Sequence, residues 1–141
     1  MNEDISDTAL NTIFGEVIHY YTRAQALADG VLVDVTETAR EAGFRVPLAL
    51  TAAAWDKAVA WTDADSARQT QQDESGRLWD VIWMAYTTAR RASGGCRVPF
   101  QVHAVPRGGR AIATRPMTLH MHLGPGDEGE PVITVMNPDE D

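Results

Sequence analysis

The sequence predicts an α+β domain: an N-terminal helical layer, with a central buried helix over about residues 75–92, packed on a C-terminal antiparallel meander of three to four strands. Two observations predict this fold. Apolar side chains surround most of the segment before Gly95 at helical spacing, and after Gly95 the apolar period becomes two, as in a strand. The 141 residues fit one domain, expected over residues 12–141 behind a mobile, polar lead-in over residues 1–11.

The first elements are predicted from residue type and from capping signals. Residues 13–21 mix β-branched and aromatic side chains, which suit a short strand. Thr22 and Gln25 have the spacing of a capping box, and Gly30 offers a left-handed stop, so a helix is expected over residues 23–29.

Four further segments precede the central helix. The first is predicted as a brief β-branched strand over 31–35, and the second as a helix over 37–42 that Thr36 caps and Gly43 ends. A further helix is expected to begin after Thr51 and to end at Trp61. The polar stretch over 62–75 is predicted as either a loop with one helical turn or an exposed helix. No strand is predicted between Pro47 and Thr51.

The central helix carries the strongest pattern in the chain. Leu78, Ile82 and Ala85 share one face, while Trp79 and Trp83 lie on the neighbouring face. An apolar arc of this width is too large for a helix that is half in water, so the helix is expected to be largely buried.

The C-terminal strands are predicted from alternation. The apolar residues of 98–104 and of 117–123 recur at every second position, and residues 132–136 form a third, β-branched strand. Two turns, PRGGR at 106–110 and GPGDEGEP at 124–131, separate these strands.

Composition points to a soluble, cytoplasmic protein. Cys96 is the single cysteine, so neither an intrachain disulfide nor a cysteine-rich zinc site can form. The N-terminus MNEDISDTALN lacks the features of a signal peptide, and no apolar stretch reaches the length of a membrane span, so no membrane partner is expected.

Charge is sorted into blocks along this chain of net charge −8. No acid occurs between Asp80 and Asp127, and that span holds six arginines, which form the candidate basic face: Arg90, Arg91, Arg97, Arg107, Arg110 and Arg115. The candidate acidic face comprises Asp63, Asp65, Asp73, Glu74, Asp127, Glu128 and Glu130. Such a basic block meets either an anionic partner or the acids of its own chain, with the C-terminal NPDED as one possible cover.

Several short motifs keep other chemistries open. His120 and His122 project from one strand face and, with His103 on the neighbouring strand, could bind a metal; the alternative is that they face solvent. The GPGDEGE turn could hold calcium or magnesium, or simply be a solvated turn. Gly108-Gly109 could present amides to a phosphate, and Cys96 beside Arg97 could be a reactive thiol, although a plain turn and a packed cysteine are the simpler interpretations.

His19-Tyr20-Tyr21-Thr22 resembles the opening of ADP-ribosyltransferase domains, in which a histidine on the first strand binds the nicotinamide nucleotide. That resemblance covers about fifteen residues. It implies an NAD-dependent activity for which Tyr86 and Glu130 are the only further candidates.

Three longer stretches resemble a known family: IFGEVIHYYTRAQALADGVLVDVTETAREAGFRVPLALT, WTDADSARQTQQDESGRLWDVIWMAY and GPGDEGEPVITVMNPDED. They are similar to small bacterial proteins of unknown function carried on plasmids, integrative elements and phages. The resemblance implies an accessory protein of a mobile genetic element, and no assigned activity, catalytic residue or cofactor comes with it.

Three functions follow as hypotheses. The first is a non-enzymatic binder of a host or element-encoded protein, by analogy an anti-defence inhibitor of a CRISPR or restriction complex. The second is a nucleic-acid or phosphate-ligand binder that uses the arginines. The third is a small metal- or NAD-dependent enzyme.

Overall fold

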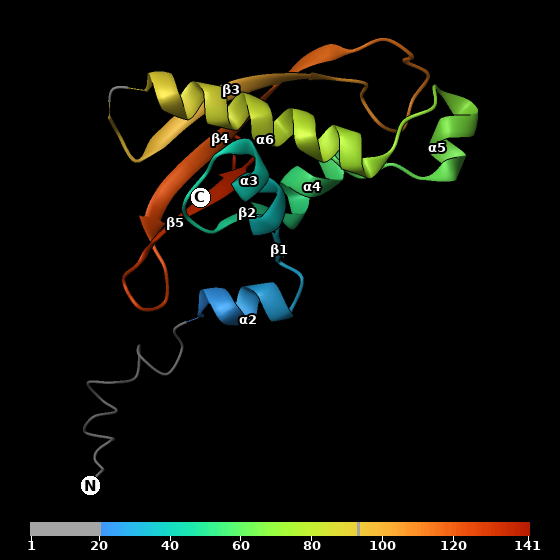
Figure 1. Cartoon of the computed structure of the whole chain (residues 1–141). Helices are drawn as coiled ribbons and strands as arrows, with labels where there is room; N and C mark the ends of the chain where they lie inside the picture. The colour runs from blue at the N-terminus through green and yellow to red at the C-terminus, as the bar shows by residue number, and fades with distance from the viewer. Residues whose placement is uncertain (1–20, 93) are drawn as a thin grey trace, which may run out of the picture.

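The computed structural model describes residues 21–92 and 94–141 (Figure 1). The lead-in over residues 1–11 and all but the last residue of the strand predicted over 13–21 lie outside this part of the chain; Tyr21 itself is not in a strand. Within the described residues no helix is both long and apolar enough to cross a membrane.

Over residues 21–92 and 94–141, five strands form one mixed sheet. In spatial order they are β1 (Leu32–Asp34), β2 (Leu48–Thr51), β5 (Pro131–Met136), β4 (Arg115–Pro125) and β3 (Arg97–Ala104). Strands β2 and β5 run parallel, and the other neighbouring pairs are antiparallel. The α+β class is therefore confirmed, whereas the purely antiparallel meander of three to four strands is wrong.

Strand β2 is the reason for that difference. Its first three residues, Leu48, Ala49 and Leu50, are all buried, so the segment has no apolar alternation to reveal it. Strand β2 pairs with β5 on one side, where Leu48 lies opposite Ile133, and with β1 on the other side. It therefore connects the N-terminal strand β1 to the C-terminal strands. The sheet is thus built from both halves rather than from the C-terminal half alone.

In the described residues five helices accompany the sheet: α2 (Arg23–Ala28), α3 (Thr36–Ala42), α4 (Ala52–Ala58), α5 (Asp63–Arg68) and α6 (Glu74–Arg91). The capping box of Thr22 and Gln25 is present, and Thr51 caps α4 by accepting from the Ala54 amide. Thr36 does not cap α3 as predicted. Its hydroxyl donates to the carboxylate of Asp34 instead and accepts from the Leu48 amide, which ties β1 to β2.

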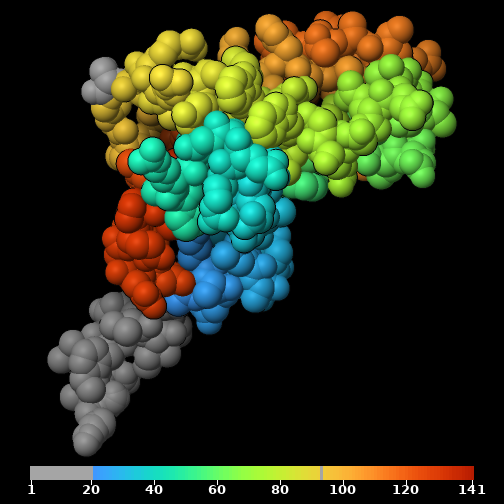
Figure 2. Space-filling view, viewed as in Figure 1, coloured from blue at the N-terminus to red at the C-terminus, as the bar shows by residue number. Residues whose placement is uncertain are grey.

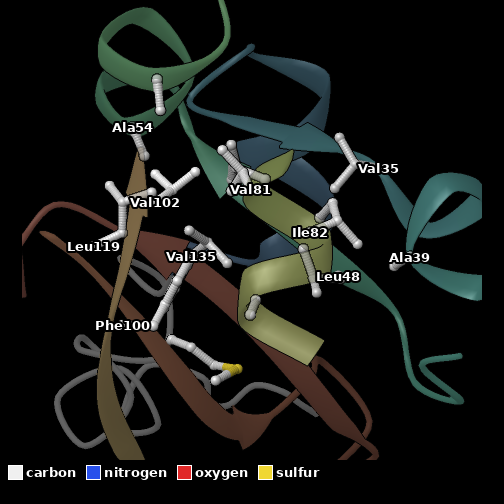
Figure 3. Packing of buried hydrophobic residues seen from close by; sticks show 14 of the residues in the cluster. Val35, Ala39, Leu48, Ala54, Val81, Ile82, Phe100, Val102, Leu119 and Val135 are labelled. Atoms are coloured by element: carbon white, nitrogen blue, oxygen red, sulfur yellow. The ribbon is translucent and has the colours of Figure 1, made fainter. Parts of the chain in front are cut away.

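Helices α3, α4 and α6 share the core with one face of the sheet. Val81 and Ile82 of α6 pack with Phe100 of β3, Leu119 of β4 and Val135 of β5 (Figure 3). Helix α2 packs against β1, and its Arg23 reaches the Thr134 hydroxyl. Because Ile133 and Val135 face the core, Thr134 points to the opposite side of the sheet.

Helix α6 is less buried than predicted. Its observed bounds, residues 74–91, confirm the predicted position of the helix. Trp79 and Trp83 are nevertheless 37% and 43% exposed. In the space-filling view α6 forms an uncovered ridge above α3 (Figure 2). The sheet and the short helices cover only one side of α6, so its second apolar face meets solvent.

Gly43 shows why α3 ends where it does. Its φ of 126° disfavours other residues, and a Cβ at this position would lie 2.6 Å from Cζ of Tyr86. Phe44 then packs edge-on against the same ring, with 5.3 Å between the ring centroids. Glycine therefore lets the end of α3 approach α6 closely.

Leu119 is fully buried in β4, so Leu119→Ala should lower the free energy of unfolding by about 2–5 kcal/mol, because the cavity it leaves can close only in part. Urea unfolding monitored by circular dichroism measures this loss. The matched control is Ile112→Ala, at a side chain that is 66% exposed, which should change the same quantity by less than about 0.5 kcal/mol. Equal losses in the two variants would contradict this core.

Candidate binding surfaces

The six arginines of the basic block lie in two groups at opposite ends of β3. Arg90, Arg91 and Arg97 gather where α6 ends and β3 begins, and Arg107, Arg110 and Arg115 gather around the β3–β4 loop (Figure 1). The eight residues of β3 separate the groups by about 23 Å at about 3.3 Å per residue. The arginines therefore do not form one continuous face.

Arg97 is covered by the C-terminal tail. Its guanidinium donates to His120 Nδ1 at 2.8 Å and to the backbone carbonyls of Pro138 and Glu140 at 3.2 and 2.6 Å. The carboxylate of Glu140 in turn accepts from the Thr51 hydroxyl and from the Asn137 amide. The tail is thus bound to the sheet through its backbone as well as through its acid.

Arg107 is paired with acids of the chain's own first half. Its Nε donates to Asp65 Oδ2 at 2.8 Å, and its Nη1 donates to Asp56 Oδ1 at 3.0 Å. These two bonds draw the β3–β4 loop onto α4 and α5. They also raise the pKa of Arg107 above its ordinary value, with the hydrogen bond to Asp65 as the largest cause.

Asp65 is the most buried acid of the candidate acidic face, only 2% exposed. Besides Arg107, its carboxylate accepts from the backbone N–H and the hydroxyl of Thr62 and from Nη2 of Arg68. The Thr62 amide is the largest cause that holds the pKa of Asp65 below its ordinary value; burial opposes it, and the hydrogen bond from Arg107 adds to it. Asp65 therefore already binds groups of its own chain and is not available to a partner.

Gln69 clamps the same loop. Its side-chain amide donates to the carbonyls of Pro106 and Ala111 at 2.8 and 2.6 Å, and its oxygen accepts from the Gly108 amide at 3.1 Å. The Gly108 amide, considered above for phosphate binding, is therefore already used within the protein.

The other acids of the candidate acidic face lie on three segments: the first turn of α5, the start of α6 and the β4–β5 turn. Asp73 accepts from the Gly76 amide at the start of α6, and Glu74 accepts from the Trp61 amide. Asp127 lies in the β4–β5 turn, and its carboxylate accepts from the backbone amides of Arg23 and Ala24. It thus caps the start of α2, although the two segments are about a hundred residues apart in the sequence. Asp63, in the first turn of α5, and Glu128, beside Asp127, are exposed, and Glu130 accepts from the Glu128 amide.

An aromatic row runs along α6 from the exposed Trp79 and Trp83 to the partly buried Tyr86, whereas the sequence pattern predicted that this helix would be largely buried. Trp79 stacks on Trp83 with 5.9 Å between ring centroids, and Trp83 lies 5.8 Å from Tyr86. The guanidinium of Arg90 lies 5.9 Å from the centre of the Tyr86 ring. We call Trp79, Trp83, Tyr86 and Arg90 the aromatic row.

Two adjoining hollows of about 380 Å³ each lie between β3 and the part of α6 that carries Trp79 and Trp83. They share Asp80 and His103, and we call them together the edge groove. Residues from α6 and β3 that line it include Trp79, Asp80, Trp83, Met84, Gln101, Val102, His103 and Ala104. Partial burial raises the pKa of Asp80, and the positive charge of Arg77 opposes that rise.

Strand β3 presents a free backbone edge to the edge groove. It is the last strand of the sheet, and the Cys96 carbonyl accepts from the Leu123 amide at 2.8 Å. In an antiparallel pair the bonded residues alternate, so the even-numbered residues of β3 bond to β4. The N–H and C=O groups of Gln101 and His103 therefore point away from the sheet, and Pro99, which has no N–H, lies on the same outward series.

A model of a family of unknown function matches residues 10–141. The chain belongs to the DUF6573 family. Neither the curated proteins nor the solved structures contain a match. Family membership therefore assigns no activity, and the function has to be argued from the surfaces of this chain.

The three candidate metal-binding histidines do not converge. Pairing places His103 opposite Pro116 and His120 opposite Pro99, so these histidines are about 13 Å apart along the ribbon. His120 also accepts from Arg97 through Nδ1. In the part of the chain that the structure describes, no three His, Cys, Asp or Glu side chains are close enough to hold a metal.

The residues considered for an NAD-dependent activity lie in different places. Tyr86 packs against Gly43 and Phe44 under α3, whereas Glu130 lies in the β4–β5 turn. His19 lies outside the described residues. Cys96 is exposed, but its neighbour Arg97 is turned toward the tail.

The lowered pKa of Asp65 predicts an acid-dependent loss of stability. A carboxyl whose pKa falls on folding stabilises the protein above its ordinary value of 3.8, and this contribution is lost as the pH falls through the folded-state pKa. Asp65→Asn should therefore be less stable at pH 7 and should lose less stability on acidification. Thermal midpoints measured from pH 7 to about pH 2 test this.

Asp63→Asn is the matched control, because Asp63 is exposed and lies in the same first turn of α5. It should retain the acid dependence of the unaltered protein. An equally shallow pH profile in both variants would exclude Asp65 as the source.

Proposed function

We propose that this protein is a non-enzymatic binding protein that docks an extended segment of a partner protein in the edge groove. The observation that carries the proposal is the exposed, stacked pair Trp79 and Trp83 beside the free edge of β3. Tryptophan, tyrosine and arginine are the residues that most often dominate binding energy at protein interfaces. The aromatic row consists of these three types.

The free edge supplies the backbone half of such an interface. An added strand could exchange hydrogen bonds with the outward N–H and C=O groups of Gln101 and His103. Pro99 cannot donate, so the added strand would pair mainly between Pro99 and Ala104. This short length limits pairing between copies of the protein and suits a short recognition segment.

The side chains around the groove indicate the chemistry of the partner. Alternate residues of an added strand would face α6, where Trp83 and Met84 provide an apolar wall. Asp80 and Asp73 line the same groove, and Asp80 is partly desolvated. A segment with apolar residues at alternate positions and a lysine or arginine near Asp80 would complement both features.

Within this proposal the partner is a host or element-encoded protein, and the protein is an accessory factor of a mobile genetic element. An anti-defence inhibitor of a CRISPR or restriction complex is one form that such a binder takes. Nucleic-acid binding is supported less well, because the arginines lie in two separated groups and Arg97 and Arg107 already bind within the chain.

Peptide-library selection on the purified protein tests the aromatic row. Selected peptides should show the alternating apolar pattern with a basic residue, and Trp79→Ala together with Trp83→Ala should weaken their binding by at least about tenfold. Fluorescence polarisation with a labelled peptide measures the affinity. Ile112→Ala, which also removes an exposed apolar side chain, should leave the affinity unchanged; equal weakening in both variants would contradict the proposal.

A backbone variant tests the free edge separately. Gln101→Pro removes an N–H that points away from β4, so the sheet should remain paired while the added strand loses a donor. Peptide affinity should fall by about tenfold or more, and far-UV circular dichroism should not change. Gln101→Ala retains the N–H and should bind normally. Normal binding by the proline variant would exclude strand addition at this edge.

A further inference from the structure

A second groove, of about 630 Å³, lies between α4, α5 and the start of β4. Four cationic side chains line it, together with two acids. We call it the basic groove and define it by Lys57, Arg68, Arg107, Arg115, Asp56 and Asp65. Its volume is within the range of small-molecule sites.

The basic groove holds more positive charge than its acids neutralise. Asp65 is already saturated by donors from Thr62, Arg68 and Arg107. Asp56 is largely exposed and is in contact with Arg107. Among the described residues, neither Lys57 nor Arg115 has a carboxylate within 4.0 Å. An excess of two positive charges thus lies in one concave place on a protein of net charge −8.

The cations of the groove are partly held in place before any ligand binds. Two bonds to Asp65 and Asp56 fix Arg107 through Nε and Nη1, which leaves its Nη2 as a donor. Gln69 holds the loop that carries Arg107 at three points. A guanidinium fixed in this way loses little side-chain entropy when it binds an anion.

We propose that the basic groove binds a small molecule that carries a phosphoryl group. A phosphate monoester has about two negative charges at pH 7, which match the excess charge of the groove, and a diphosphate has at least as many. Guanidinium groups recognise phosphate oxygens through paired hydrogen bonds, and Arg107 and Arg115 supply such donors together with the ammonium of Lys57. Pro116 and Met117 provide an apolar wall for the remainder of the molecule.

This site is separate from the edge groove, because the two share no lining residue. Phosphoryl binding and peptide binding can therefore be tested independently of each other. The Trp79→Ala and Trp83→Ala double variant should bind phosphoryl ligands as the unaltered protein does.

Isothermal titration of the full chain with pyrophosphate and with inorganic phosphate tests the proposal. Saturable binding should appear at low salt and weaken as salt is added. Lys57→Gln together with Arg115→Gln should reduce the affinity for pyrophosphate by about tenfold or more. Arg90→Gln together with Arg91→Gln removes the same net charge at the other end of β3 and should reduce it far less.

Three results would overturn the proposal. The first is the absence of saturable binding up to about 10 mM pyrophosphate. The second is an equal loss of affinity in the two double variants, which would indicate only the general electrostatic field of the protein. The third is tight binding of a glutamate-rich peptide that pyrophosphate cannot displace, which would assign the groove to an acidic protein segment.

Discussion

Arg77 lies on the buried face of α6, only 4% exposed, and its guanidinium joins segments that are far apart in the sequence. Nε donates to the Val59 carbonyl just after α4, and Nη1 donates to the carbonyl of Val105 just after β3 and to the side chain of Gln72. The ring of Trp61 lies 4.6 Å away. The ends of α4, α6 and β3 must therefore meet around this cation, since a buried charge without such partners would cost several kcal/mol.

Burial and the charges around Arg77 both change its pKa. Burial, and then the positive charge of Arg107, lower the pKa of Arg77, while the negative charge of Asp65 opposes them. Asp65 lies on α5 and binds Arg107 directly, whereas the hydrogen-bond partners of Arg77 are neutral groups. The acid-free block of the sequence is thus partly neutralised by the acidic first half of the chain, and this pairing fixes the β3–β4 loop.

The fold was predictable where the signal is local. The capping box at Thr22, the position of α6 and the three C-terminal strands depend on residues close in sequence, and all are confirmed. Strand β2 was not predictable, because its parallel partner β5 lies more than eighty residues later and its buried residues do not alternate. The exposure of Trp79 and Trp83 was also missed, since it depends on which side of α6 the sheet and the short helices cover.

The β3–β4 ribbon explains why two different grooves exist on so small a protein. Strand β4 extends past the last residue of β5 that pairs with it, at the His120–Met136 pair, so β3 and β4 continue as a two-stranded ribbon beyond the end of β5. Its outer strand forms a wall of the edge groove, and the start of β4 forms a wall of the basic groove. The loop that joins the strands is held by Gln69, Asp65 and Arg77, and these contacts therefore define the geometry of both surfaces.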